Sequence, residues 1–229
     1  MSLSRPLKVL CLHGFLQNSK IFYEKASGIR KALKKINAET FFLDGPTILE
    51  KKDLPFEIDD ENKWKEIVDS GINRAWWYHV EDLNIENALT AVKECILKEG
   101  PFDGILGFSQ GAALAAIVTN NISTLVPGHQ QFKFSILFSA YAFTTTDESA
   151  VLKEKYAHLF KVPNDLETLT IHVYGSSDTH VPKERSLLLA SYYPENIKKT
   201  IEHEGGHFVP NKKPIISKII EYVETSLKN

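Results

Sequence analysis

The chain has 229 residues, of which 43% are hydrophobic and 24% are charged. This composition is ordinary for a globular protein, and the length is enough for one domain with a sizeable core. The 29 acidic residues nearly balance the 27 basic ones, for a formal net charge of -2. A nearly neutral chain has no strong field to attract nucleic acid or an anionic membrane, so neither partner is expected.

Residues 1–6 are polar, and no apolar run along the chain approaches the length of a membrane span. Cys11 and Cys95 both lie in apolar periodic segments, which favours reduced, buried thiols in a cytosolic protein. We therefore predict a cytoplasmic protein, with the nucleus as the alternative, that does not insert stably into a membrane. Nothing in the pattern indicates an oligomeric state.

Predicted strands and helices alternate along most of the chain. The apolar run 7–12 predicts a buried strand, near-helical spacing predicts a helix over about 19–35, and 40–43 predicts a second strand. After residue 80, helices are predicted over 85–98, 109–120 and 214–227, and strands over 103–108, 132–139, 169–174 and 197–202. This alternation predicts an α/β fold with a mostly parallel central sheet and helices on both faces, in a single domain spanning 1–229.

Residues 46–80 interrupt the alternation. They contain three prolines or glycines, an acidic cluster around Asp59 and all three tryptophans of the chain. A linker rarely carries every tryptophan of a protein, so we predict a small lid-like excursion above the sheet. The acidic cluster is predicted to be a solvated surface.

The segment Gly107-Phe-Ser-Gln-Gly111 matches the G-x-S-x-G pattern of a nucleophile elbow. It lies between an apolar strand and an alanine-rich helix, which is the strand-turn-helix setting that the pattern requires. The glycines leave room for a sharp turn, and the helix N-terminus places partial positive charge where an oxyanion would form. The alternative is that Ser109 simply caps the helix.

A serine hydroxyl becomes a strong nucleophile only when an imidazole removes its proton and a carboxylate orients that imidazole. In this type of site the acid and then the histidine follow the serine along the chain. Asp178 follows the predicted strand 169–174 at its carboxyl end, whereas Asp147 lies in a polar loop and Asp165 precedes a strand. Position therefore selects Asp178 as the acid.

Three histidines follow Asp178 along the chain and are candidates for the base: His180, His203 and His207. His180 lies two residues beyond Asp178 on the same short loop, too near to it to span the distance to the serine. His203 ends a predicted strand, and His207 follows a flexible Glu-Gly-Gly turn that lets the chain bend toward the nucleophile. Spacing favours His207 and leaves His203 as the alternative.

An oxyanion hole needs two preorganised N–H donors. One is expected from Gln110, directly after the nucleophile, and the other from Phe15 in the loop after the first strand. His13 is expected to be structural. Trp76, Trp77 and Tyr78 are predicted to line an apolar wall that binds substrate, with plain packing of the excursion as the alternative reading.

Four motifs together resemble the fungal family of serine hydrolases that is related to the human ovarian-cancer-associated serine hydrolase. The similarity covers about residues 7–223, including the aromatic segment 73–79. The motifs are His13-Gly-Phe-Leu-Gln17, Gly107-Phe-Ser-Gln-Gly111, Asp178-Thr-His-Val-Pro182 and Gly205-Gly-His-Phe-Val-Pro210.

The resemblance implies an α/β-hydrolase fold and a carboxylic-ester hydrolase with the triad Ser109, Asp178 and His207, working without a metal or cofactor. It thereby favours His207 over His203 more strongly than spacing does. The expected partner is a small-molecule acyl ester, cleaved through an acyl-enzyme intermediate. Alternatives are a thioesterase or lysophospholipase with the same triad, and a non-catalytic binding module that retains the fold.

Overall fold

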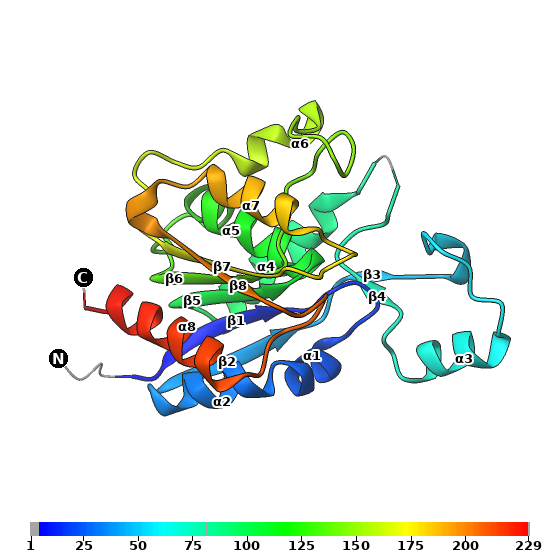
Figure 1. The fold of residues 1–229 in the computed structure, drawn as a ribbon, viewed down its shortest axis with the longest axis horizontal. Coiled ribbons are helices and arrows are strands. Elements are labelled where there is room, and N and C mark those ends of the chain that lie inside the picture. Colours follow the sequence, from blue (N-terminus) through cyan, green and yellow to red (C-terminus); the bar gives the residue numbers. More distant parts are fainter. Residues whose placement is uncertain (1–4, 81, 229) are drawn as a thin grey trace.

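The computed structural model describes residues 5–80 and 82–228. Six strands form a parallel sheet in the order β2-β1-β5-β6-β7-β8 (Figure 1). Their bounds are β1 Leu7–Leu12, β2 Ala38–Leu43, β5 Gly104–Phe108, β6 Phe134–Phe138, β7 Leu169–Gly175 and β8 Lys198–His203. The prediction of a mostly parallel central sheet is confirmed, and all carboxyl ends of these strands meet at one edge.

Helices cover both faces of the sheet, as predicted (Figure 1). On one face the core is completed by α1 Ser19–Lys25, α2 Ser27–Lys35 and α8 Lys213–Ser226. On the other face it is completed by α4 Ile85–Glu99, α5 Gln110–Leu125, the short α6 Glu154–Ala157 and α7 Lys183–Ser191. The inner strands β5, β6 and β7 are buried at every position. β5 is an apolar run, as expected for a strand covered on both faces, whereas β6 and β7 also bury polar side chains: Ser135, Thr170 and His172.

The predicted helix over 19–35 is two helices in the structure. The chain changes direction at Ala26, which has φ -86° and ψ 14° and is completely buried. The Ala26 N–H still donates to Phe22 O, and Ala26 O accepts from Arg30 N, so the hydrogen bonding continues across the bend. The bend lets Phe22 and Ile29, on successive helices, pack into the same core.

The excursion at 46–80 has a paired base and an exposed tip, which is formed by α3 (Glu61–Asp69) and the residues before it. Its base is an antiparallel pair of short strands, β3 Thr47–Ile48 and β4 Arg74–Ala75. A 3-10 turn at Lys51–Asp53 and the helix α3 Glu61–Asp69 lie between them, and α3 stands away from the sheet and has no buried residue (Figure 1). The chain re-enters the core at Trp76 and Trp77, which are both buried.

Cys11 and Cys95 are buried and unpaired, as the sequence predicts. Among the residues that the structure describes, no helix is at once long enough and apolar enough to cross a membrane.

Candidate active site

Ser109 occupies the sharp turn between β5 and α5. Its backbone has φ 54° and ψ -118°, a region that side-chain-bearing residues rarely enter, and its N–H donates to Phe138 O at 2.9 Å. Its side chain makes no capping hydrogen bond to the helix. Strained backbone of this kind is typical of functional sites, and the Ser109 hydroxyl is left free to face another partner.

The glycines on either side are required by close backbone contacts. A Cβ atom on Gly111 would lie 2.1 Å from the carbonyl oxygen of Leu12, and one on Gly107 would lie 2.2 Å from the carbonyl oxygen of Gly111. Neither backbone group can move without disturbing the sheet or the helix. The elbow therefore accepts only glycine at both positions, for the steric reason expected from the sequence.

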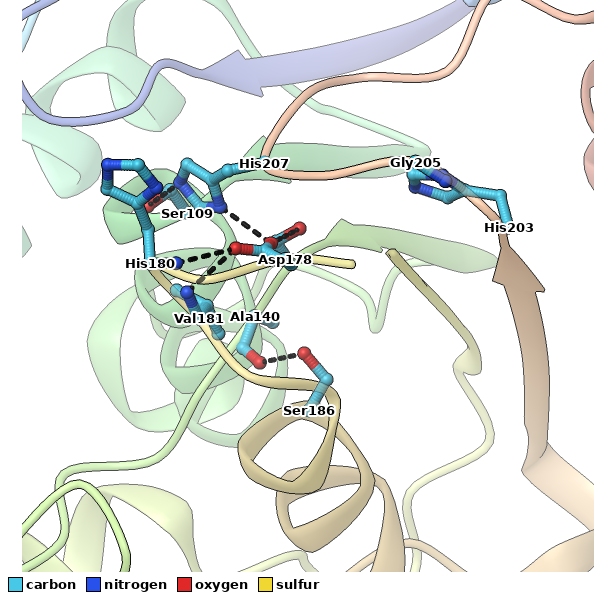
Figure 2. Close-up of polar contacts among 10 residues, drawn as sticks. Ser109, Ala140, Asp178, His180, Val181, Ser186, His203, Gly205 and His207 are labelled. Atoms are coloured by element: carbon cyan, nitrogen blue, oxygen red, sulfur yellow. Dashed lines mark hydrogen bonds and ion pairs between the residues drawn. The ribbon is translucent and has the colours of Figure 1, made fainter. Parts of the chain in front are cut away.

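The structure brings Ser109, His207 and Asp178 together (Figure 2). His207 Nε2 lies 3.0 Å from Ser109 Oγ, and His207 Nδ1 lies 2.7 Å from Asp178 Oδ2. With an ionised Asp178, Nδ1 must carry the proton, because a carboxylate only accepts hydrogen bonds. Nε2 is then the unprotonated nitrogen and can accept the serine proton.

Asp178 is held by three donors besides His207. Its Oδ2 accepts from Ser139 Oγ at 2.9 Å, and its Oδ1 accepts from the backbone N–H groups of His180 at 3.0 Å and Val181 at 2.9 Å. Burial alone would raise the pKa of this carboxyl, but the bonds from His207, Val181 and Ser139 favour the charged form and hold the pKa below its usual value. Asp178 is thus a fixed, ionised acceptor.

The two other candidate histidines take different positions. The ring of His203 contacts Phe208 at 5.2 Å between centroids, its Nδ1 accepts from Gly205 N–H at 3.1 Å, and Figure 2 shows it well apart from Ser109. The ring of His180 stacks on His207 with centroids 5.2 Å apart and an interplanar angle of 25°. The structure therefore brings His207 to the serine, and His180 packs against it.

The two rejected acids also lie elsewhere. Asp147 forms an ion pair with Arg185 at 2.8 Å, and its side chain is 78% exposed. Asp165 accepts a hydrogen bond through its backbone carbonyl from Gln131. Among the described residues, only Asp178 is hydrogen-bonded to a His207 ring nitrogen as a carboxylate.

The loop after β1 is fixed by His13. Its Nε2 accepts from Gly45 N–H at 2.8 Å, its Nδ1 donates to Gly14 O at 2.7 Å, and its carbonyl oxygen accepts from Trp76 Nε1 at 2.7 Å. Burial lowers the pKa of His13 to about 4, although the bond to Gly14 opposes this shift. His13 is therefore a neutral, fully bonded side chain that shapes the loop carrying Phe15.

The two predicted oxyanion donors border the same cavity. Neither the Phe15 N–H nor the Gln110 N–H donates a hydrogen bond to another residue in the described part of the chain. The Gln110 side chain is occupied: Oε1 accepts from Trp76 N–H and Nε2 donates to Trp77 O, each at 3.1 Å. These two bonds tie the inner end of the excursion to the helix that follows Ser109.

The site opens into a cavity of about 960 Å³ whose wall includes Ser109 and His207. Of the three aromatic residues predicted to bind substrate, only Trp77 lines it. Trp76 is fully buried against His13, with ring centroids 5.1 Å apart, and Tyr78 is half-buried outside the lining. The two neighbouring tryptophans therefore differ: Trp77 borders the cavity, and Trp76 packs against His13.

Three residues of the site were missed by sequence reasoning. Ser139 follows β6 with φ 49° and donates to Asp178, His79 packs edge-on against Phe15 at 4.6 Å, and Arg185 projects from α7 into the cavity. Ser139 has a sequence signal, because it directly follows the carboxyl end of a strand next to β5. His79 and Arg185 have none, since their positions depend on segments distant in sequence.

A parallel sheet with a serine elbow after an inner strand, and an acid and a histidine after later strands, is the arrangement of the α/β-hydrolase fold. The solved structure of a Bacillus cereus carboxylesterase has this fold in common with the chain. The TM-score is 0.60 at 16% sequence identity, and the match covers 97% of this chain and 89% of the carboxylesterase.

The sequence comparisons are more specific. The family model described as "Serine hydrolase (FSH1)" matches residues 1–219, and the chain belongs to this family. It is 34% identical to "Family of serine hydrolases 3" of Saccharomyces cerevisiae, over 97% of this chain and 85% of the relative. It is also 34% identical to "Esterase OVCA2" of Homo sapiens, over 93% of this chain and 94% of the relative. The resemblance read from the motifs is confirmed.

Proposed function

We propose that the protein hydrolyses carboxylic esters through an acyl-enzyme, with Ser109 as nucleophile, His207 as general base and Asp178 as the acid that orients it. The observation that carries this proposal is the hydrogen-bonded chain Ser109 Oγ, His207 Nε2, His207 Nδ1 and Asp178 Oδ2, with separations of 3.0 Å and 2.7 Å. Membership of a serine hydrolase family with esterase relatives supports it.

The reaction proceeds in two balanced steps. Ser109 Oγ bonds to the ester carbonyl carbon while its proton passes to His207 Nε2, and the alkoxide leaves with that proton as an alcohol. Water then attacks the acyl-enzyme and gives a proton to His207. The bond from Ser109 Oγ to the acyl carbon breaks, and the proton returns to Oγ as the carboxylic acid is released.

The N–H groups of Phe15 and Gln110 are proposed as the oxyanion hole. Both residues border the cavity, and both groups lack another acceptor among the described residues. Removing one such donor raises the barrier by about 2.7–4 kcal/mol in a well-studied hydrolase. The substrate is proposed to be a small-molecule acyl ester whose apolar part lies against Trp77.

Replacement of Ser109 by alanine tests the assignment. In purified Ser109→Ala protein, kcat for 4-nitrophenyl esters should fall on the order of a millionfold, because the members of such a triad act as one unit. Labelling by a fluorophosphonate probe should disappear with it. Ser191→Ala is the matched control, since this exposed serine only bonds the Leu188 carbonyl and should leave both readouts unchanged. Ser109-independent turnover or labelling would overturn the proposal.

A cytoplasmic location is proposed on the state of the cysteines. Cys11 and Cys95 are unpaired, and burial raises the pKa of Cys95 to about 11, so it stays a protonated thiol at neutral pH. Free thiols of this kind suit a reducing compartment. Subcellular fractionation should recover the protein with cytosolic markers, and enrichment in a secretory fraction would contradict this.

A further inference from the structure

Arg185 is an unusual residue in the wall of the cavity. It projects from α7 into the same space as Ser109 and His207, and its side chain is only 13% exposed. Removing a guanidinium from water is costly unless its donors are filled by good partners. A nearly buried arginine in a cavity therefore needs an explanation in terms of what it binds.

The groups around the guanidinium compensate for only part of the cost of its burial. The guanidinium lies over the ring of Tyr141, 4.5 Å from its centroid, which supports its charge and orients its plane. Nη1 forms an ion pair with Asp147 Oδ1 at 2.8 Å, whereas Nε is buried without a hydrogen-bond partner among the described residues.

The ion pair with Asp147 compensates little for the burial of Arg185. The Asp147 side chain is 78% exposed, in the loop between β6 and α6, and an ion pair with one partner in solvent contributes little to stability. An incoming anion can displace such a carboxylate easily. Asp147 thus shows how an anionic oxygen group can lie against the guanidinium of Arg185.

Arg185 and the proposed reaction centre border the same cavity, as does His79. Burial lowers the pKa of His79; the charge of Asp147 opposes this shift, and the charge of Arg185 adds to it. His79 packs against the ring of Phe15, and its Nε2 lies 3.5 Å from Gln110 Nε2. His79 thus contacts both residues proposed to hold the oxyanion, and it lines the same cavity as Arg185.

The charges around the cavity favour an anion. Among its described lining residues, the lysine and arginine side chains are Lys25, Lys153 and Arg185, and the only carboxylate is Asp147. The rest of the wall near Arg185 is largely apolar, with Trp77, Leu83 and Phe143 among its members. A ligand that matches this wall has an apolar body and one negative group.

We infer that the ester substrate carries an anionic oxygen group, a carboxylate or a phosphonate or phosphate, which replaces Asp147 on the guanidinium of Arg185. The planar fork of arginine suits such groups, because two N–H donors can face two oxygens at once. The apolar part of the substrate then lies against Trp77 and Phe143, and its ester carbonyl reaches Ser109. This inference rests on the proposed ester hydrolysis and names its substrate class.

Three matched 4-nitrophenyl esters test it. One is the monoester of adipic acid, with a free carboxylate; the second is its methyl-capped neutral analogue; the third carries a phosphonate at the same position. The wild-type protein should show a higher kcat/KM for an anionic ester than for the neutral one. Which anionic ester is preferred identifies the group, and a wild-type preference for the neutral ester would overturn the inference.

Variants of Arg185 give the decisive comparison. Arg185→Gln should lower kcat/KM for the preferred anionic ester at least about tenfold, the usual scale for a charge-assisted hydrogen bond, and leave the neutral ester nearly unchanged. Arg185→Lys should recover part of the loss. Lys183→Gln is the matched control, because Lys183 starts the same helix outside the cavity lining and pairs with Glu202. Equal loss on both esters would overturn the inference.

Asp147→Asn provides an independent readout if Arg185→Gln does not fold. It removes the carboxylate that competes for Arg185 from an exposed position, so kcat/KM for the anionic ester should rise while that for the neutral ester stays the same. If kcat/KM for the anionic ester does not rise selectively, while turnover of the neutral ester still depends on Ser109, the inference is overturned and the proposed function stands. Absence of any Ser109-dependent turnover of the three esters would instead overturn the proposed function, and this inference with it.

Discussion

The carboxyl edge of the sheet and the excursion at 46–80 both border the cavity, but they are held in different ways. At the sheet edge, Ser109, Ser139 and Asp178 follow three neighbouring parallel strands and are buried. In the excursion, α3 has no buried residue and stands away from the body of the molecule (Figure 1). The groups that need fixed geometry thus come from the sheet, and the excursion contributes surface around the opening.

The difference lies within the excursion as well as between the two regions. Its inner end is held by the bonds from Gln110 to Trp76 and Trp77, whereas the helix α3 at its tip has no buried residue. We therefore expect substitutions near Trp76 and Trp77, which are hydrogen-bonded to the helix after Ser109, to affect the site more than substitutions in α3.

Of the three comparisons between the two regions, the largest effect is expected at the sheet edge, from Asp178→Asn. An amide in place of the carboxylate favours the wrong His207 tautomer, and in a well-studied serine protease the equivalent change lowers kcat about 10⁴-fold. Ester turnover of the folded variant measures it. The matched change His203→Gln alters a buried histidine that bonds only its own loop, so kcat should stay within about threefold. A large loss in this control would place His203 in the site.

A smaller difference is expected in stability, when a glycine of each region is replaced by alanine. Gly111→Ala should lower the free energy of unfolding by about 3 kcal/mol or more, because its Cβ would overlap the Leu12 backbone. Gly71→Ala in the excursion has only Asn18 Nδ2 nearby, at 3.7 Å, and should cost only the roughly 1–2 kcal/mol of a positive φ, here 67°. Urea denaturation compares them, and equal losses would contradict the contrast.

The smallest effect is expected at the tip. Replacing residues 61–69 by a Gly/Ser linker of the same length removes α3 without removing a buried side chain. The free energy of unfolding should change by less than about 1 kcal/mol, since most surface changes are small. kcat for a short neutral ester should be retained. A loss of stability comparable to that of Gly111→Ala would show that the tip belongs to the core after all.

Local sequence patterns were enough to predict the framework. The strand 7–12 coincides with β1, because its end is marked by a change from apolar residues to His13-Gly14. The elbow was predictable for the same reason, since its glycines and its strand and helix are adjacent in sequence. Chain order then selected Asp178, and the Gly-Gly turn before His207 indicated the residue that the structure brings to Ser109.

Features that depend on distant segments were not predictable. Arg185 reads as an ordinary surface charge of a helix, and its burial depends on Tyr141 and the loop of Asp147. The strands β3 and β4 are two residues each, which is too short for a pattern. Trp76 and Trp77 are identical neighbours, so the sequence cannot tell which faces the cavity and which bonds His13.

The short pair β3–β4 makes the excursion a replaceable module. Because Thr47 pairs with Ala75 and Ile48 with Arg74, residues 49–73 begin and end at one paired base, and Asn18 Nδ2 also bonds the carbonyl oxygens of Ser70 and Gly71. The entropy of closing a loop grows only slowly with its length, so insertions and deletions there are tolerated. Evolution, or a protein engineer, can therefore exchange this stretch to change what the cavity admits, while the register between Trp76, Trp77 and Gln110 is preserved.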